Sequence, residues 1–138
     1  MRIIALKGKG NSGKSTTLNL VYDSLINIQG NRSTPKKILG NPVQRDFECI
    51  VTRINQTTIG FYTMGDYSKY TLQAINAFQL LNVDILILAT NSKFKKPTRR
   101  INQFPNSHII MKSIPNVKST VNMNAENQKD CNQILSLL

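Results

Sequence analysis

The sequence predicts an α/β protein whose mainly parallel sheet has helices on both faces and contains one antiparallel hairpin strand. Apolar runs typical of buried parallel strands alternate along the chain with segments whose apolar residues recur at helical spacing. Two strand-like runs near the middle lie so close in sequence that they should pair as an antiparallel hairpin. Right-handed crossovers between the parallel strands then place helices on both faces of the sheet. The length of 138 residues fits a single domain over residues 1–138.

The first half of the chain is predicted to supply a strand, a helix and the hairpin. Between Lys14 and Gln29 the apolar residues form one helical stripe, and Gly30 is expected to end that helix. The segment from Phe47 to Ile54 is rich in β-branched residues, as strands are. The predicted elements are a strand from Arg2 to Leu6, this helix, a loop over 31–36, a short strand from Lys37 to Leu39, and hairpin strands from Phe47 to Ile54 and from Thr58 to Met64.

The second half is predicted to alternate helices with strands. Ser68 is expected to cap a helix that runs to Leu81. Ile85 to Ala89 is a continuous apolar run, as expected of a central parallel strand that is covered on both sides. The remaining predicted elements are a long basic loop over 90–106, a strand from His108 to Lys112, and a final helix capped by Asn124.

A glycine-rich segment connects the first predicted strand to the first predicted helix. It fills the pattern Gly-x-x-x-x-Gly-Lys-Ser and leads into Thr16; its residues are Gly8, Lys9, Gly10, Asn11, Ser12, Gly13, Lys14 and Ser15. Glycines permit backbone angles that a Cβ would forbid, so successive N–H groups can point toward an anion at the positive end of the helix. Lys14 is expected to contact the β- and γ-phosphates of a nucleoside triphosphate, and Ser15 to bind Mg²⁺.

This segment resembles the Walker A loop of the P-loop NTPase superfamily. The order of strand, loop and helix around it extends the resemblance to most of the chain. The resemblance implies a three-layer P-loop NTPase fold, with ATP or GTP and Mg²⁺ as ligands. It does not imply one reaction, because this fold hosts hydrolases, kinases and switches. The guanine-reading Asn-Lys-x-Asp motif is not present, so ATP is the default ligand.

Three aspartates are candidates for the acid that positions Mg²⁺ or acts in catalysis. Asp66 follows the predicted strand that ends at Met64, and therefore lies at the carboxyl edge of the sheet, where ligands bind. We choose Asp66 for this Walker B role, although an acid there also complements the dipole of the next helix. Asp84 precedes its strand and is expected to be a structural turn residue at the opposite edge. Asp46 reaches the site only if its strand is antiparallel; otherwise it belongs to an ordinary polar loop.

The loop also carries a second lysine, Lys9, five residues before Lys14. The string Lys-Gly-Asn-Ser-Gly-Lys-Ser is similar to the deviant Walker A loop of partition and division-site ATPases, although Asn11 replaces a glycine of that pattern. The resemblance implies that Lys9 reaches the nucleotide of a partner subunit in a nucleotide-dependent homodimer. The simpler interpretation is that Lys9 adds positive charge near phosphate. Tyr67 stands directly after Asp66, where some P-loop ATPases carry a catalytic glutamate, so fast hydrolysis by that mechanism is not expected.

The formal net charge of +11 indicates attraction to polyanions, such as nucleotides, nucleic acid or an acidic partner. Part of the excess is clustered between Asn91 and Lys112, where no acidic residue occurs; such a cluster is also typical of a surface that binds nothing. No segment has the apolar length of a membrane span, so no membrane partner is expected. Cys49 and Cys131 are isolated, as in a reduced, cytoplasmic protein.

Three functions fit these features. The first is Mg-dependent binding of a nucleoside triphosphate with hydrolysis or switching, in which Lys14, Asp66 and Asp46 are the candidate catalytic residues. The second is a small-molecule or nucleotide kinase that uses residues 93–100 as a lid, with Arg99 and Arg100 closing over the phosphate. The third is a nucleic-acid-associated ATPase, in which Phe94 and Phe104 stack on bases among the basic residues.

Overall fold

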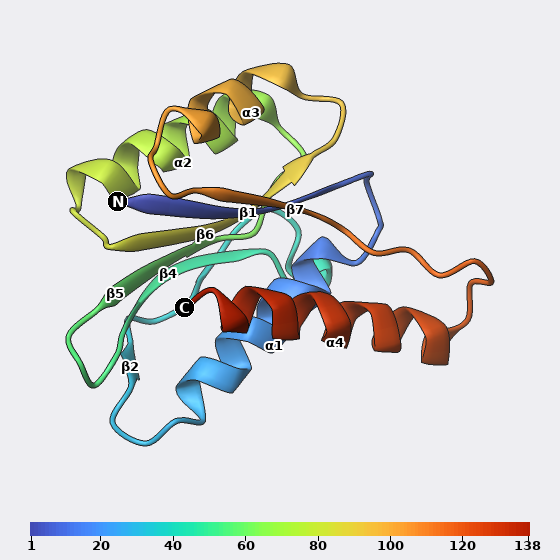
Figure 1. Ribbon diagram of the computed structural model, residues 1–138, viewed down its shortest axis with the longest axis horizontal. Helices are drawn as coiled ribbons and strands as arrows, with labels where there is room; N and C mark the ends of the chain where they lie inside the picture. The colour runs from blue at the N-terminus through green and yellow to red at the C-terminus, as the bar shows by residue number, and fades with distance from the viewer.

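The computed structural model describes residues 1–138, and of Gln44 it describes the backbone alone. A seven-stranded sheet is packed between helices on its two faces (Figure 1). The helices are α1 (Lys14–Ile26), α2 (Ser68–Leu80), α3 (Lys95–Asn102) and α4 (Thr120–Ser136), with one short 3-10 helix, η1 (Pro42–Gln44). The strands are β1 (Arg2–Gly8), β2 (Arg32–Ser33), β3 (Lys37–Ile38), β4 (Phe47–Thr52), β5 (Thr58–Tyr62), β6 (Ile85–Asn91) and β7 (His108–Met111).

The sheet has the order β2-β4-β5-β6-β1-β7, and β3 also pairs with β4. Strands β5, β6, β1 and β7 are parallel neighbours, whereas β4 runs antiparallel to β5 and to the short strands β2 and β3. This arrangement confirms the predicted mainly parallel sheet and the predicted hairpin of β4 and β5. Because β4 runs against its neighbours, its amino end lies at the edge where β1, β5 and β6 have their carboxyl ends.

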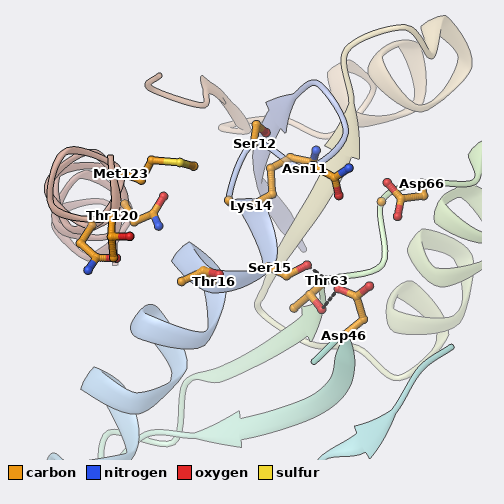
Figure 2. Close-up of a pocket in the computed structure, with 14 residues that line it drawn as sticks. Asn11, Ser12, Lys14, Ser15, Thr16, Asp46, Thr63, Asp66, Thr120 and Met123 are labelled. Carbon is orange, nitrogen blue, oxygen red and sulfur yellow. Dashed lines mark hydrogen bonds between the residues drawn. The ribbon is translucent and has the colours of Figure 1, made fainter. Parts of the chain in front are cut away.

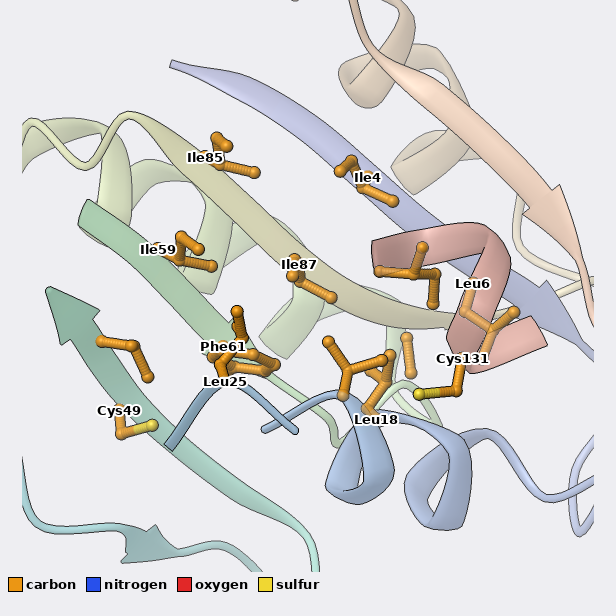
Figure 3. Close-up of a cluster of buried hydrophobic side chains, with 14 of the residues drawn as sticks. Ile4, Leu6, Leu18, Leu25, Cys49, Ile59, Phe61, Ile85, Ile87 and Cys131 are labelled. Carbon is orange, nitrogen blue, oxygen red and sulfur yellow. The ribbon is translucent and has the colours of Figure 1, made fainter. Parts of the chain in front are cut away.

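Alternate side chains of the central strands enter two separate cores. On one face, Ile4 and Leu6 of β1 pack with the buried sides of α1 and α4 (Figure 3). On the other face, Ile3 and Ala5 of the same strand pack with α2 and α3. Every residue of β6 is buried, since this strand lies between two others and under helices on both faces. The continuous apolar run that predicted a central strand therefore has this double coverage as its physical cause.

The basic segment that was expected to be a loop contains a helix, α3. Pro97 is the third residue of this helix, where the backbone nitrogen needs no partner within the helix, so a proline is tolerated. The side chains of Pro97 and Ile101 are buried, whereas Lys95, Lys96 and Arg99 are exposed. The prediction of a loop over 90–106 was wrong, because a proline in the first turn of a helix removes no hydrogen bond and does not break the helix.

Several helix ends also differ from the prediction. Tyr67 is the N-cap of α2 and Ser68 is its first residue, with no side-chain cap. The cap of α4 is Ser119, whose Oγ accepts a hydrogen bond from the backbone of Asn122 at 3.1 Å, so Asn124 lies inside the helix. Helix α1 ends at Ile26, with Gly30 four residues further on at a φ of 93°. Strand β2 lies within the segment 31–36 that was predicted to be a loop.

Among the described helices, none combines the length and the apolar character that crossing a lipid bilayer requires.

Candidate functional site

The loop between β1 and α1 lies at the carboxyl edge of the parallel strands and forms one wall of a cavity of about 460 Å³ (Figure 2). Asn11 and Gly13 have φ values of 57° and 93°, the left-handed backbone conformation that helps successive N–H groups to converge. The cavity is lined by loop residues 11–16, by residues that precede β4 and follow β5, and by the first turns of α4. The glycine-rich segment identified in the sequence therefore borders a real cavity.

The side chain of Lys14 is folded back over the loop. Its Nζ donates hydrogen bonds to the backbone carbonyl of Lys9 at 2.6 Å and to that of Gly8 at 3.1 Å. Burial lowers the pKa of this lysine, and the nearby carboxylates of Asp66 and Asp46 oppose that shift. The ammonium is thus held at the cavity wall by neutral carbonyls and attracted by two acids.

Ser15 is joined directly to Asp46, the acid that precedes β4. The hydroxyl of Ser15 donates to Asp46 Oδ1 at 2.5 Å, and the hydroxyl of Thr63 lies 2.9 Å from the same oxygen (Figure 2). Thr63 Oγ1 in turn accepts from the backbone nitrogen of Phe47 at 2.9 Å, which fixes the start of β4 to the end of β5. Asp46 is only 3 % exposed. Burial raises its pKa, and the hydrogen bonds from Ser15 and Thr63 counteract that rise.

Asp66 lines the same cavity but has a different environment. It follows Gly65, whose close approach to β6 leaves no room for a side chain, because an added Cβ would lie 2.6 Å from the backbone carbon and oxygen of Ala89. Asp66 is exposed, and no hydrogen bond joins it to Ser15. Of the two acids proposed from the sequence, Asp46 is therefore the one in contact with the serine of the loop.

The wall opposite the acids comes from α4, which the sequence had not connected with the site. Thr120, Met123, Asn124 and Asn127 line the cavity from this helix. Asn127 is buried, and its Oδ1 lies 3.3 Å from the hydroxyl of Thr17 in α1. The only signal in the sequence is the spacing of Thr120, Met123, Asn124 and Asn127, which places them on one helical face; nothing in their types indicates a ligand.

A buried ion pair fixes α4 beside the loop. Lys112 Nζ lies 2.9 Å from Asp130 Oδ2, and each side chain is 1 % exposed. Asp130 also accepts hydrogen bonds from the backbone nitrogen and the hydroxyl of Ser113, both at 2.8 Å. Lys112 in turn follows β7 and donates its backbone N–H to Lys7 at 2.7 Å. The pair thus connects the middle of α4 to the end of the sheet from which the loop begins.

Other residues predicted for the site lie elsewhere. Lys9 and Gly10 are exposed and do not line the cavity, and Gly8 is the last residue of β1. Arg99 and Arg100 lie on α3, and neither lines the cavity. The guanidinium of Arg100 donates to Asn76 and Gln79 of α2 at 3.2 and 2.9 Å, and it stacks on Phe104 at 4.7 Å.

Two further residues have structural roles. Asp84 precedes β6 at the opposite edge of the sheet, as expected, and accepts a hydrogen bond from the backbone of Thr58 at 2.8 Å. Phe104 is buried, so it is not available to stack on a nucleic-acid base.

Within the part of the chain that the structure describes, no group of three or more histidine, cysteine, aspartate or glutamate side chains is arranged to hold a metal ion. No protein-family model, curated protein or solved structure matches this chain. The geometry of the loop, the acids and α4 is therefore what any functional proposal for this chain must rest on.

Proposed function

We propose that this protein binds a magnesium nucleoside triphosphate, with ATP as the default, and acts as a hydrolase or a nucleotide-dependent switch. One observation carries the proposal: an ammonium, a hydroxyl and a buried carboxylate, from Lys14, Ser15 and Asp46, meet at the cavity beside the loop. Under this proposal the α/β architecture is a three-layer P-loop NTPase fold that forms one cytoplasmic domain over residues 1–138.

The loop and Lys14 would hold the polyphosphate. The backbone N–H groups of residues 11–16 precede or begin α1, where the helix dipole and unpaired N–H groups favour an anion. Lys14 already lies at this wall, and its ammonium would exchange the carbonyls of Gly8 and Lys9 for phosphate oxygens. A charged donor bound to phosphate forms a stronger hydrogen bond than one bound to a neutral carbonyl, so the exchange is favourable.

Ser15 and Asp46 fit a magnesium ion as oxygen ligands. Mg²⁺ prefers carboxylate, hydroxyl, phosphate and water oxygens. Oδ1 of Asp46 accepts both hydroxyl hydrogen bonds, and within the described residues its Oδ2 has no hydrogen-bond partner, so it is open to a ligand. The ion, when bound, neutralises charge on the phosphates. Asp66, the acid preferred from the sequence, lines the same cavity and would orient water there.

Slow turnover is the expected behaviour. Tyr67, which is exposed, follows Asp66 in place of a glutamate. A candidate base for the attacking water is therefore one of the two aspartates, and neither is paired with a histidine or a second acid in the described residues. We therefore expect a switch-like protein that holds its nucleotide for longer than an efficient hydrolase does.

Binding is tested by titration calorimetry with MgATP on the intact chain. Lys14→Ala should weaken binding about 10- to 100-fold, the value of a charge-assisted hydrogen bond to phosphate. Lys118→Ala removes the same charge from an exposed position outside the cavity and is the matched control. Equal affinities for the wild type and Lys14→Ala would refute the proposal.

Substitution of Asp46 and of Asp66 should have different effects on the Mg²⁺ concentration that nucleotide binding requires. Asp46→Asn should increase the Mg²⁺ concentration needed for half-maximal nucleotide binding, because it removes a carboxylate in contact with Ser15. Asp66→Asn should leave that concentration unchanged and lower the hydrolysis rate. The opposite assignment, with Asp66 as the metal-binding acid, predicts the reverse pattern.

A nucleic-acid-associated ATPase is the second candidate, and one surface favours it. Lys93, Lys95, Lys96 and Arg99 are exposed at the start of α3 and along it, so the positive charge is presented on one side of a helix. Binding to DNA or RNA that weakens steeply with salt would support this candidate.

The kinase alternative depends on Arg99 and Arg100 as a lid, and the side chain of Arg100 is hydrogen-bonded to α2 instead. Lys9 is exposed and accessible to a partner subunit, as a nucleotide-dependent homodimer requires.

A further inference from the structure

We propose that the surface formed by the beginnings of α2 and α3 binds single-stranded nucleic acid. On this surface Tyr67 and Tyr70 stack on unpaired bases, and the neighbouring lysines contact phosphates. The inference rests on the second candidate function and adds to it a class of ligand and a pair of aromatic residues. It does not require nucleotide binding by the loop, because none of the tyrosines and lysines concerned lines the cavity.

Helices α2 and α3 lie side by side on one face of the sheet (Figure 1). They follow the adjacent parallel strands β5 and β6, so both helices begin at the carboxyl edge of the sheet. Arg100 of α3 joins the two helices through its hydrogen bonds to Asn76 and Gln79 of α2. The exposed side chains at the beginnings of the two helices therefore belong to one surface.

The charge on this surface has one sign. Between Tyr67 and Ala125 the only acidic residue is Asp84, which lies at the opposite edge of the sheet, and Asp66 directly before this segment lines the cavity. The exposed basic residues of the surface are Lys69, Lys93, Lys95, Lys96 and Arg99. Helices α1 and α4 on the other face carry acids as well as lysines. The α2–α3 face is therefore the one that attracts a phosphate backbone.

Two exposed tyrosines supply flat aromatic surface beside these cations. Tyr67 is 57 % exposed and Tyr70 is 45 % exposed, and their rings pack edge to face with centroids 5.6 Å apart. Lys69 lies between them in the sequence and is exposed as well. The phenylalanines considered from the sequence are less accessible, since Phe104 is buried and Phe94 is half-buried. Exposed aromatic rings among lysines are typical of a surface that stacks bases and neutralises phosphates.

The same features favour a single strand over a duplex. In a duplex the faces of the bases are already stacked on one another, whereas in a single strand they are open to a tyrosine ring. Reading a duplex commonly requires a helix that enters the major groove. Helix α3 does not project in this way, because Pro97 and Ile101 are buried and Arg100 is hydrogen-bonded to α2.

The test measures fluorescence anisotropy with the intact chain, in the absence of nucleotide, for three labelled ligands of equal length. These are an oligothymidylate, an abasic strand that has the same phosphates but no bases, and a duplex. A length of about 20 nucleotides exceeds the roughly 4–16 that one small binding domain covers. The oligothymidylate should bind at least about fivefold more tightly than the abasic strand, the value of one stacked base, and more tightly than the duplex.

Equal or weaker binding of the oligothymidylate in either comparison, or no binding of any of the three, would overturn the proposal. The first result would show a surface for polyanions in general, such as an acidic protein. Titration of the loop with MgATP is a separate measurement, so the proposed nucleotide binding can stand when this inference fails. An oligouridylate of the same length distinguishes RNA from DNA as the preferred single strand.

Variants of the two helices locate the effect. Tyr67→Ala and Tyr70→Ala should each weaken oligothymidylate binding about 5- to 100-fold and leave binding of the abasic strand unchanged. Tyr70→Phe keeps the ring and should bind like the wild type. Wild-type affinity in both alanine variants, or an equal loss in Tyr70→Phe and Tyr70→Ala, would show that the rings do not stack on bases.

Salt dependence tests the lysines. Lys95→Ala should reduce the slope of log affinity against log salt by about 0.7, the value of one phosphate contact in a single strand. Lys129→Ala is the matched control, since Lys129 is exposed on α4 at the other face of the sheet. An equal change of slope in the two variants would mean that the α2–α3 face is not where the strand binds.

Discussion

The buried pair of Lys112 and Asp130 gives the sharpest prediction about stability. Asp130→Asn keeps the shape of the side chain but leaves the Lys112 ammonium inside the protein without its counter-charge; both side chains are 1 % exposed. Removing one partner of a buried ion pair costs about 3–5 kcal/mol, because the remaining charge is desolvated and unpaired. The carbonyl of Ser113, 2.8 Å from Lys112 Nζ, compensates only in part, since it is neutral. We therefore expect the lower end of that range, about 3 kcal/mol.

Urea denaturation followed by circular dichroism measures this cost as a change in midpoint at constant slope. In thermal unfolding the same loss corresponds to a decrease of roughly 10 °C for a domain of this size. The double variant Lys112→Met with Asp130→Leu is the matched comparison, since it removes both charges and should recover most of the stability. A loss below about 1 kcal/mol in Asp130→Asn would show that the pair is solvated and would refute the argument from burial.

Three further outcomes follow from other contacts. Lys14→Met should increase the free energy of unfolding at neutral pH by no more than about 1 kcal/mol, seen as a higher melting temperature, although it should weaken the proposed nucleotide binding. Burial lowers the pKa of Lys14 from its ordinary value of 10.5, so the folded protein binds this proton less readily than the unfolded chain does. The free energy of unfolding of the wild type should therefore rise as the pH increases toward 10.5, and that of the variant should not show this rise. A lower melting temperature for the variant would contradict this. Gly65→Ala should lower the free energy of unfolding, measured by urea denaturation, by about 1–3 kcal/mol, because the added Cβ would lie 2.6 Å from the backbone of Ala89. An unchanged free energy of unfolding would mean that the segment between β5 and α2 can move away from β6. Burial raises the pKa of Cys49 to about 11 and also raises that of Cys131, so both thiols should resist iodoacetamide at pH 7 until the protein is unfolded, and rapid labelling of the native protein would show that they are accessible.

Local patterns in the sequence predicted the sheet and the loop well, because their causes are local. Strand β6 reads as a continuous apolar run since both faces are covered, and the glycines and lysine of the loop are adjacent in the chain. The position of Asp46 was also predictable, though only through the direction of β4: an antiparallel strand brings its amino end to the site. Because β4 and β5 are close in sequence, they are expected to pair as an antiparallel hairpin, and this pairing gives the direction of β4.

The remaining features depend on contacts between distant segments. Helix α3 has only eight residues, too few to be stable by itself, and it is held by buried Pro97 and Ile101 and by the hydrogen bonds of Arg100 to α2. The contribution of α4 to the cavity depends on its packing against α1, which no periodicity specifies. Ser15 and Thr63 both donate to the same carboxylate oxygen of Asp46, and these three residues come from separate parts of the chain.

The hydrogen bonds of Lys14 to the carbonyls of Gly8 and Lys9 have a consequence for the residence time of any phosphate ligand. An arriving polyphosphate must separate the ammonium from two acceptors, so the net gain in affinity is the difference between the two sets of bonds. On departure the ammonium has acceptors to return to, and the loop is not left with an unsolvated cation. These contacts therefore stabilise the empty loop, which lowers the net affinity for a phosphate ligand and favours its release.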